Sequence, residues 1–146
     1  MTDKDMWKLF MSKENLQDVK YEAWAFGGDP DGLAQLALDG IKTGTASAYP
    51  LYEMENEPLP EAGSYSVILD SKDEAACIIQ TTKVYVVPFN QVSKEHAYKE
   101  GEGDRSLSYW EKVHEDFFSN CMSEAGKTFD KNMLVVCEEF KVVFRG

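Results

Sequence analysis

An abrupt change of pattern near Gly40 constrains the fold more than any other feature of the chain. Apolar side chains recur at helical spacing over residues 33–38, and Gly40 follows at the position where a left-handed glycine commonly ends a helix. Residues 43–47 then have the composition of a strand, in which alternate side chains share a face. The segment therefore predicts a short helix that leads through a tight turn into a strand.

Lys42 and Thr45 lie at this change of pattern and are the first candidate functional residues. In a regular strand their side chains would point to opposite faces, whereas a chain still turning at Gly44 would let them converge. An amine beside a hydroxyl is typical of nucleophilic catalysis, because a desolvated lysine can accept the hydroxyl proton. An exposed lysine followed by strand-forming threonines fits the same pattern.

Length and charge favour a single acidic domain. The chain has 146 residues, 43% of them apolar, which is sufficient for one hydrophobic core. Its net charge of −11 makes the surface repel polyanions, since binding to a nucleic-acid backbone normally requires clustered Lys and Arg. A single nucleoside or a short single strand therefore fits this chain better than a long duplex.

The cysteines and histidines do not have metal-ligand spacing. Cys77, Cys121 and Cys137 form an odd set, which predicts free thiols in a reducing cytoplasm rather than disulfides. Neither Cys-x-x-Cys nor His-x-x-x-His occurs, so we expect no structural metal and no cofactor. The first residues are polar and lack a long apolar run, which predicts neither a signal peptide nor a membrane span.

The amino-terminal part predicts a helix and a short aromatic strand. Residues 2–12 have one apolar face and a capping residue, and we assign residues 1–20 to this helix and its connector. The main domain is expected over residues 21–146. Trp24 and Phe26 share one face of its first strand, where Trp24 could stack a base or simply pack in the core.

A proline- and glutamate-rich stretch, residues 48–62, predicts a long surface loop. The loop begins beside Lys42, so Tyr49 and Tyr52 could contact a substrate or anchor the loop. Ser47 lies on the same expected strand face as Thr45.

The remaining chain predicts a hairpin, two helices and a closing strand. The expected strands are residues 64–69, 76–87 and 133–144, the last interrupted by a pair of glutamates, and Ser93 is expected to cap a short helix before Gly101. In the helix predicted over residues 106–119, Ser108 and Glu111 fit a capping box. We expect His114 to be a packing or solvated residue, because no triad partner accompanies either histidine.

Three acids close together follow the short helix: Glu100, Glu102 and Asp104. Burial of any of them would raise its pKa and suit it to proton transfer. A solvated acidic loop, with Arg105 offsetting part of the charge, fits the same residues.

The motif Gly40-x-Lys42-x-x-Thr45 resembles the signature of the ASCH domain family, small PUA-like proteins associated with RNA and modified nucleosides. The resemblance runs from about residue 24 to 143 and includes Glu57-Pro58-Leu59-Pro60, residues 63–70, Pro88-Phe89 and the acidic glycine-rich run at residues 100–107. It implies an α+β fold, namely a small, mostly antiparallel β-barrel of about six strands decorated by about four helices.

The resemblance also implies a catalytic set. Compact bacterial amidohydrolases of this superfamily, which deacylate acetylcytidine, use a lysine, a threonine three residues later and the glutamate of a His-Ala-x-x-Glu pattern. This chain matches at Lys42, Thr45 and Glu100, with His96-Ala97 before the glutamate. The implied mechanism is attack by Thr45, with Lys42 as base or oxyanion partner and Glu100 shuttling the proton. Gly44, where a residue with a Cβ is expected, departs from the pattern.

Two other functions remain open at this stage. In an RNA-binding module without turnover, Lys42 and Arg105 would hold a phosphate while Trp24 or Tyr52 stacks a base. In a metal-dependent ribonuclease, acids of the residue 100–104 run would hold a divalent ion. The expected substrate contacts are therefore Trp24, Ser47, Tyr52 and Arg105.

Overall fold

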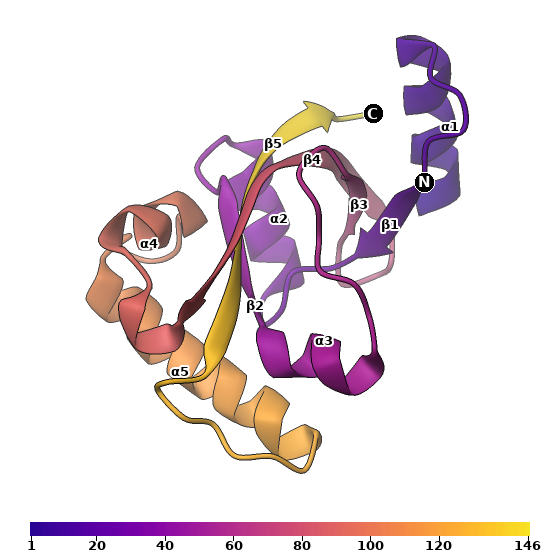
Figure 1. Ribbon diagram of the computed structural model, residues 1–146. Coiled ribbons are helices and arrows are strands. Elements are labelled where there is room, and N and C mark those ends of the chain that lie inside the picture. Colours follow the sequence, from indigo (N-terminus) through magenta and orange to yellow (C-terminus); the bar gives the residue numbers. More distant parts are fainter.

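The computed structural model describes all 146 residues, and its centre is a pair of long antiparallel strands, β4 (Ala75–Pro88) and β5 (Leu134–Phe144). Around them lies one sheet with the order β1-β3-β4-β5-β2 (Figure 1). The edge strand β1 (Tyr21–Trp24) runs parallel to β3 (Tyr65–Leu69), while β2 (Gly44–Ala48) pairs antiparallel with β5. The expected hairpin, β3 with β4, is confirmed.

The sheet is mixed and unclosed, which corrects the expected barrel. The α+β class is confirmed, but there are five strands instead of six, and the edge strands β1 and β2 do not pair with each other. The physical reason is that β1 has only four residues and stops before Gly27-Gly28, so it offers little ladder on which the sheet could close. There are five α-helices instead of about four, together with a 3₁₀ turn at Phe89–Gln91.

Helices α1 (Asp3–Glu14) and α2 (Pro30–Leu38) cover opposite faces of the β3–β4 hairpin. Thr2 and Asp5 cap α1 reciprocally, and its apolar face packs against Val67 and Ile78. Helix α2 packs instead against the neighbouring residues in each strand, Ile68, Cys77 and Ile79. Successive strand residues point to opposite faces, so this alternation places the two helices on either side of the hairpin.

The stretch expected as a long loop contains a helix, α3 (Tyr49–Glu55). The loop prediction was wrong here because Pro50 lies in the first turn, where a helix loses no hydrogen bond to proline. Asn56 then ends α3 in the left-handed conformation, with φ 53°. The remaining residues to 64 contain no further helix or strand.

Helices α4 (Lys94–Glu100) and α5 (Leu107–Glu124) lie together at the end of the sheet remote from α1 (Figure 1). Ser93 caps α4 as expected, but the cap of α5 is Ser106 and not Ser108, because the Ser106 hydroxyl accepts the Tyr109 amide. A stripe along α5 at four-residue spacing is buried: Trp110, His114, Phe118 and Met122. None of the helices is long and apolar enough to cross a bilayer.

Candidate functional site

A cleft of about 1910 Å³ lies between the edge strands β1 and β2, helix α3 and helix α5. Predicted site residues that line it are Trp24, Lys42, Thr45, Ser47, Tyr52 and Glu100. The lysine motif and Glu100, which lie far apart in the chain, therefore line the same cavity. Arg105 is not part of its lining.

The backbone conformation after α2 places the Lys42 side chain in the cleft. After α2, Gly40 adopts φ 76°, and the amides of Ile41 and Lys42 both donate to the Leu36 carbonyl at 3.0 Å. The next amide, Thr43, donates to the Lys99 carbonyl of α4 at 2.7 Å. The turn thus ties the end of α2 to α4 and leaves the Lys42 side chain only 1% exposed.

The Lys42 ammonium is paired with the end of α4. Its Nζ lies 3.5 Å from Glu100 Oε1, 3.4 Å from the Glu100 carbonyl and 3.8 Å from Glu102 Oε2. The ring of Phe26 lies 5.0 Å from the same nitrogen. Such a buried charge is tolerated because opposite charges and a π face surround it.

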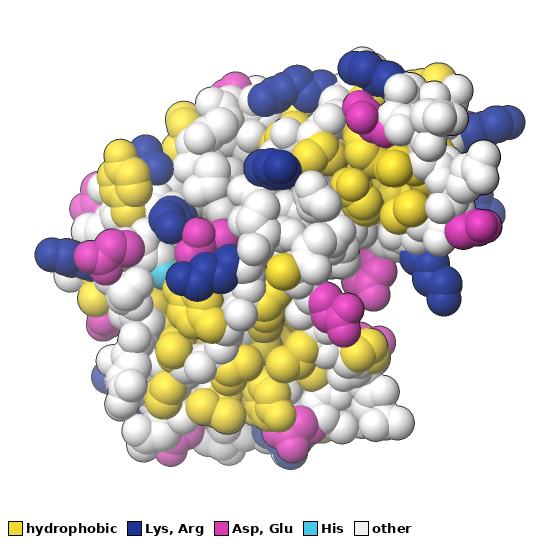
Figure 2. Space-filling view, turned by 45° about the horizontal axis from the view of Figure 1, so that its top comes forward, with side chains coloured by type: hydrophobic (Ala, Val, Ile, Leu, Met, Phe, Trp, Pro, Cys, Tyr) yellow, Lys and Arg dark blue, Asp and Glu magenta, His cyan; other side chains and the backbone are white.

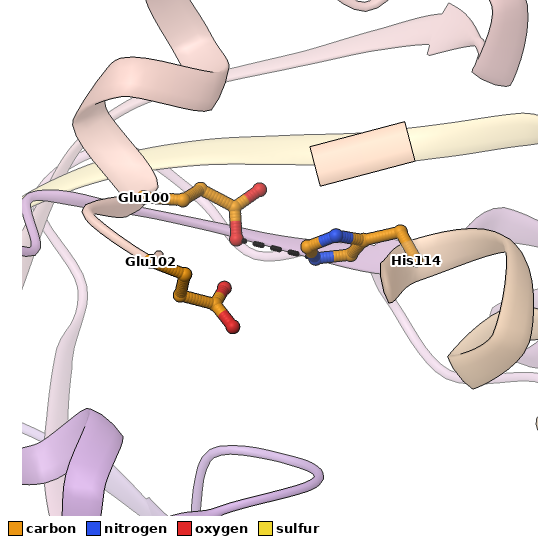
Figure 3. Close-up of side chains that lie close together, drawn as sticks. All are labelled: Glu100, Glu102 and His114. Carbon is orange, nitrogen blue, oxygen red and sulfur yellow. Dashed lines mark ion pairs between the residues drawn. The ribbon is translucent and has the colours of Figure 1, made fainter. Parts of the chain in front are cut away.

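Glu100 is buried and fully satisfied by hydrogen-bond donors. Its Oε2 accepts from His96 Nε2 at 2.8 Å and from Trp110 Nε1 at 2.6 Å, while Oε1 faces His114 Nε2 at 3.4 Å (Figure 3). Burial alone would raise the pKa of Glu100, but the two histidines and the charge of Lys42 outweigh it and hold the pKa well below its usual value. Glu100 is therefore a carboxylate.

The surroundings of His114 favour its charged imidazolium form. Its Nδ1 donates to the Trp110 carbonyl at 2.9 Å, so that nitrogen carries a proton, while Nε2 points at the Glu100 carboxylate. Burial works to lower the pKa of His114, but its hydrogen bond to Glu100 and the charges of Glu100 and Glu102 raise it above its ordinary value. The prediction of a packing residue is confirmed, because the ring is buried and stacks on Trp110 at 4.2 Å between ring centres, whereas the alternative of a solvated side chain was wrong.

The sequence reasoning assigned neither histidine to the site, although the sequence contains a signal for each of them. His96 lies four residues before Glu100, a spacing that places both side chains on one helix face. His114 interrupts the apolar stripe of α5. His96 Nε2 lies 2.8 Å from Glu100 Oε2, and its buried Nδ1 has no hydrogen-bond partner.

Glu100, Glu102 and His114 form the only cluster that could hold a metal ion, with potential ligand atoms within 4.8 Å of one another. Burial raises the pKa of Glu102, in spite of the nearby Lys42. The Lys42 ammonium lies against both carboxylates, so a bound cation would have to displace its charge. Asp104 is exposed, accepts the Ser106 amide at 2.9 Å and does not belong to the cluster.

Thr45 lines the cleft but makes no hydrogen bond to Lys42 or Glu100. It lies in β2 directly opposite Glu138 of β5, so the two side chains share one face of the sheet. A Cβ on the preceding Gly44 would lie 3.3 Å from the Glu138 carbonyl and 3.4 Å from His96 Cε1. This close approach gives a physical reason for glycine at a position where the resemblance implied a residue with a Cβ.

Glu138 is a cleft residue that the sequence reasoning did not select. It is 7% exposed, and the Thr81 hydroxyl donates to its Oε1 at 3.4 Å, beside the irregular register between Thr81 and Lys83. Burial raises its pKa to about 7, with Thr81 offsetting part of the effect. The available signal was an acidic residue inside an otherwise apolar strand.

The predicted substrate contacts separate into two groups. Ser47 and Tyr52 share a hydrogen bond of 2.8 Å at the cleft wall, where Trp24 is half-buried. Arg105 lies outside the lining of the cleft: its Nε donates to the Tyr98 carbonyl at 3.0 Å, and its guanidinium lies 3.6 Å from the Tyr98 ring centre. The position of Arg105 next to the acidic residues in the sequence did not indicate that its side chain contacts Tyr98.

Comparison with solved structures finds two close matches. A protein from Enterococcus faecalis V583 is 37% identical with a TM-score of 0.90, over 97% of this chain and 88% of that one. The ASCH domain from Lactobacillus crispatus JV V101 is 32% identical with a TM-score of 0.87, over 97% of this chain and 96% of that one.

A more distant structure shares the fold alone. An ASCH protein variant from Zymomonas mobilis is 12% identical with a TM-score of 0.51, over 86% of this chain and 70% of that one. No curated protein matches the chain. The model of the ASCH domain matches residues 22–144. Family model and structures agree, and the chain belongs to the ASCH domain family.

Proposed function

We propose that the cleft hydrolyses the amide bond of an acylated nucleoside of the acetylcytidine type. The observation that carries the proposal is the buried ion pair of Lys42 with Glu100 in a cleft that Thr45 also lines. This is the residue set, at matching positions, that the resemblance to acetylcytidine amidohydrolases implies. The cleft is large enough for a nucleoside, and its walls provide aromatic and hydroxyl side chains.

The chemistry assigns one task to each of the three residues. Thr45 Oγ1 attacks the acyl carbonyl, so that a C–O bond forms and the carbonyl oxygen becomes an oxyanion. As an ammonium, Lys42 stabilises the oxyanion while the hydroxyl proton passes to Glu100; as a base, it first gives a proton to Glu100 and then accepts the hydroxyl proton as a neutral amine. The C–N bond then breaks, the leaving amine takes the proton that Glu100 carries, and water hydrolyses the acyl-threonine ester, which releases the acid and restores the Thr45 hydroxyl.

Glu100 fits the proton-shuttle role because it is a carboxylate beside two proton carriers. Its Oε1 lies 3.5 Å from Lys42 Nζ and 3.4 Å from His114 Nε2, so it can accept a proton from one side of the site and return it. His114 extends the expected set by a group that also lines the cleft.

The test is hydrolysis of a panel of acylated cytidines, followed by chromatography without added metal. We expect Lys42→Ala and Thr45→Ala to lower turnover at least about 100-fold, because each removes a group that acts on the reacting atoms. Lys83→Ala is the matched control, since Lys83 is 62% exposed and lies outside the cleft lining. Unchanged turnover in a folded Lys42→Ala protein, verified by its melting curve, would rule out the role of this lysine.

One observation favours a second candidate, a metal-dependent ribonuclease. Glu100 and Glu102 offer two carboxylates, the ligands that manganese and magnesium prefer, and His114 adds an imidazole beside them. Incubation of the same protein with a short unstructured RNA, with and without these ions, separates the candidates. Metal-dependent shortening of the RNA would favour the nuclease.

RNA binding without turnover is the remaining outcome of that experiment. Figure 2 shows Lys and Arg at separate places over the drawn face and along its edges, together with two gatherings of hydrophobic side chains, and no continuous basic strip. Together with the net charge of −11, this disfavours long backbone contacts. Affinity for the RNA that falls steeply with salt would support phosphate-dominated binding instead.

A further inference from the structure

Glu138 is a buried acid in the cleft that the proposed mechanism does not use. No Lys, Arg or His forms an ion pair with it, in contrast to Glu100. Thr81 donates to Oε1 at 3.4 Å, and Oε2 has no hydrogen-bond partner within the chain. A side chain that is 7% exposed and lines the cavity with a free oxygen is oriented for a ligand.

The surroundings of Glu138 favour its uncharged form. The titratable groups that face Glu138 are the carboxyl group of Glu22 in β1 and the phenol of Tyr52 in α3. Cys137 is its neighbour in the chain. None of these groups supplies positive charge, and the charge of Glu22 opposes ionisation. The pKa of about 7 follows from the burial of the side chain, with Glu22 adding to it.

A neutral carboxyl group presents one donor and one acceptor side by side. This pair is complementary to a planar edge that carries an N–H next to a carbonyl oxygen or ring nitrogen, as in a cyclic amide or amidine. Nucleobases carry such edges, and protein sites read them through paired hydrogen bonds. The half-buried rings of Trp24 and Tyr52 line the same cleft and offer apolar faces to a flat ring.

We propose that Glu138, as the neutral acid, is a recognition residue that pairs with the amide or amidine edge of a nucleobase. The inference rests on the proposed function and names the part of the substrate that this side of the cleft holds. Thr45 lies directly opposite Glu138 in the sheet, so a base held there would present its substituent close to the hydroxyl. Glu138 binds and orients, while Thr45, Lys42 and Glu100 act on the acyl group.

The test is calorimetric titration with cytidine at about pH 6 and about pH 8. For the wild-type protein we expect about tenfold weaker binding at the higher pH, because the fraction of protonated Glu138 falls about tenfold across a pKa near 7. Glu138→Gln keeps an adjacent donor and acceptor, so it should bind cytidine with little pH dependence. Uridine with a methyl group on its ring N–H, whose edge is blocked, should bind weakly at both pH values.

Glu139→Gln is the matched control, because the neighbouring glutamate pairs with Lys83 and Lys99 outside the cleft. It should retain the pH dependence of the wild type. An equal pH dependence in Glu138→Gln, its absence in the wild type, or loss of cytidine binding in a folded Glu138→Gln protein would overturn the inference.

Hydrolysis is read separately, so the two proposals can fail independently. Binding of cytidine that depends on Glu138 without release of any acyl group would retain the recognition role and refute the hydrolase.

Discussion

Two buried glutamates in the same cleft, Glu100 and Glu138, have pKa values shifted in opposite directions. Glu100 is surrounded by an ammonium, two imidazoles and an indole N–H, and its pKa is held far down. Glu138 receives one threonine hydroxyl and its pKa rises to about 7. Burial opposes ionisation of both side chains, so the partners alone decide which of them carries a charge.

This difference divides the cleft into a charged side and a neutral side. The charged side contains Lys42, Glu100 and His114, where charge that develops during a reaction can be stabilised. The neutral side contains Glu138 and Thr81, where uncharged donors and acceptors suit recognition of a base. A single cavity with both properties can bind one end of a substrate and react with the other.

The largest expected effect comes from removing the charge of Glu100. Glu100→Gln leaves Lys42 with only its longer contact to Glu102, at 3.8 Å, and removes the carboxylate partner of His114, so we expect it to lower the free energy of unfolding by about 3–5 kcal/mol. Urea unfolding at neutral pH measures this loss. Glu102→Gln is the matched control and should cost much less, because burial already raises the pKa of Glu102. Equal losses would contradict the contrast between the two glutamates of this cluster.

Replacement of Glu138 should raise the free energy of unfolding at alkaline pH, whereas replacement of Glu100 lowers it. Its pKa rises from 4.5 to about 7 on folding, so the folded state binds more protons in this range and wild-type stability falls as pH rises through it. Glu138→Gln removes this ionisation and should be more stable than wild type at about pH 8, by up to about 3 kcal/mol relative to the difference at about pH 4. Urea unfolding at both pH values measures it. A difference between the proteins that does not change with pH would contradict the assigned protonation.

Much of the fold could be predicted from the sequence, because the signals for its helix ends and hairpin lie in neighbouring residues. The helix end at Gly40, the cap at Ser93 and the β3–β4 hairpin each depend on neighbouring residues. The helix α3 was missed since proline in a first turn and proline in a loop have the same composition.

The candidate site was only half predictable for a different reason. Lys42, Thr45 and Glu100 came from a motif, but the groups that set their charges lie far apart in the chain. His114 reaches Glu100 only because α4 and α5 pack together, and Glu138 meets Thr45 only through the register of β5 with β2. Residue spacing carries no information on either contact.

The smallest expected effect separates buried from exposed charge pairs. Lys83 lies 4.0 Å from Glu139 Oε2 and is 62% exposed, so water screens the pair and Lys83→Ala should change the free energy of unfolding by less than about 1 kcal/mol. Glu139 also keeps its shorter contact with Lys99, at 2.9 Å. Urea unfolding at low and high salt is the measurement, and the small difference should shrink further with salt. A loss comparable to that of Glu100→Gln would mean that burial is not what makes the Glu100 cluster matter.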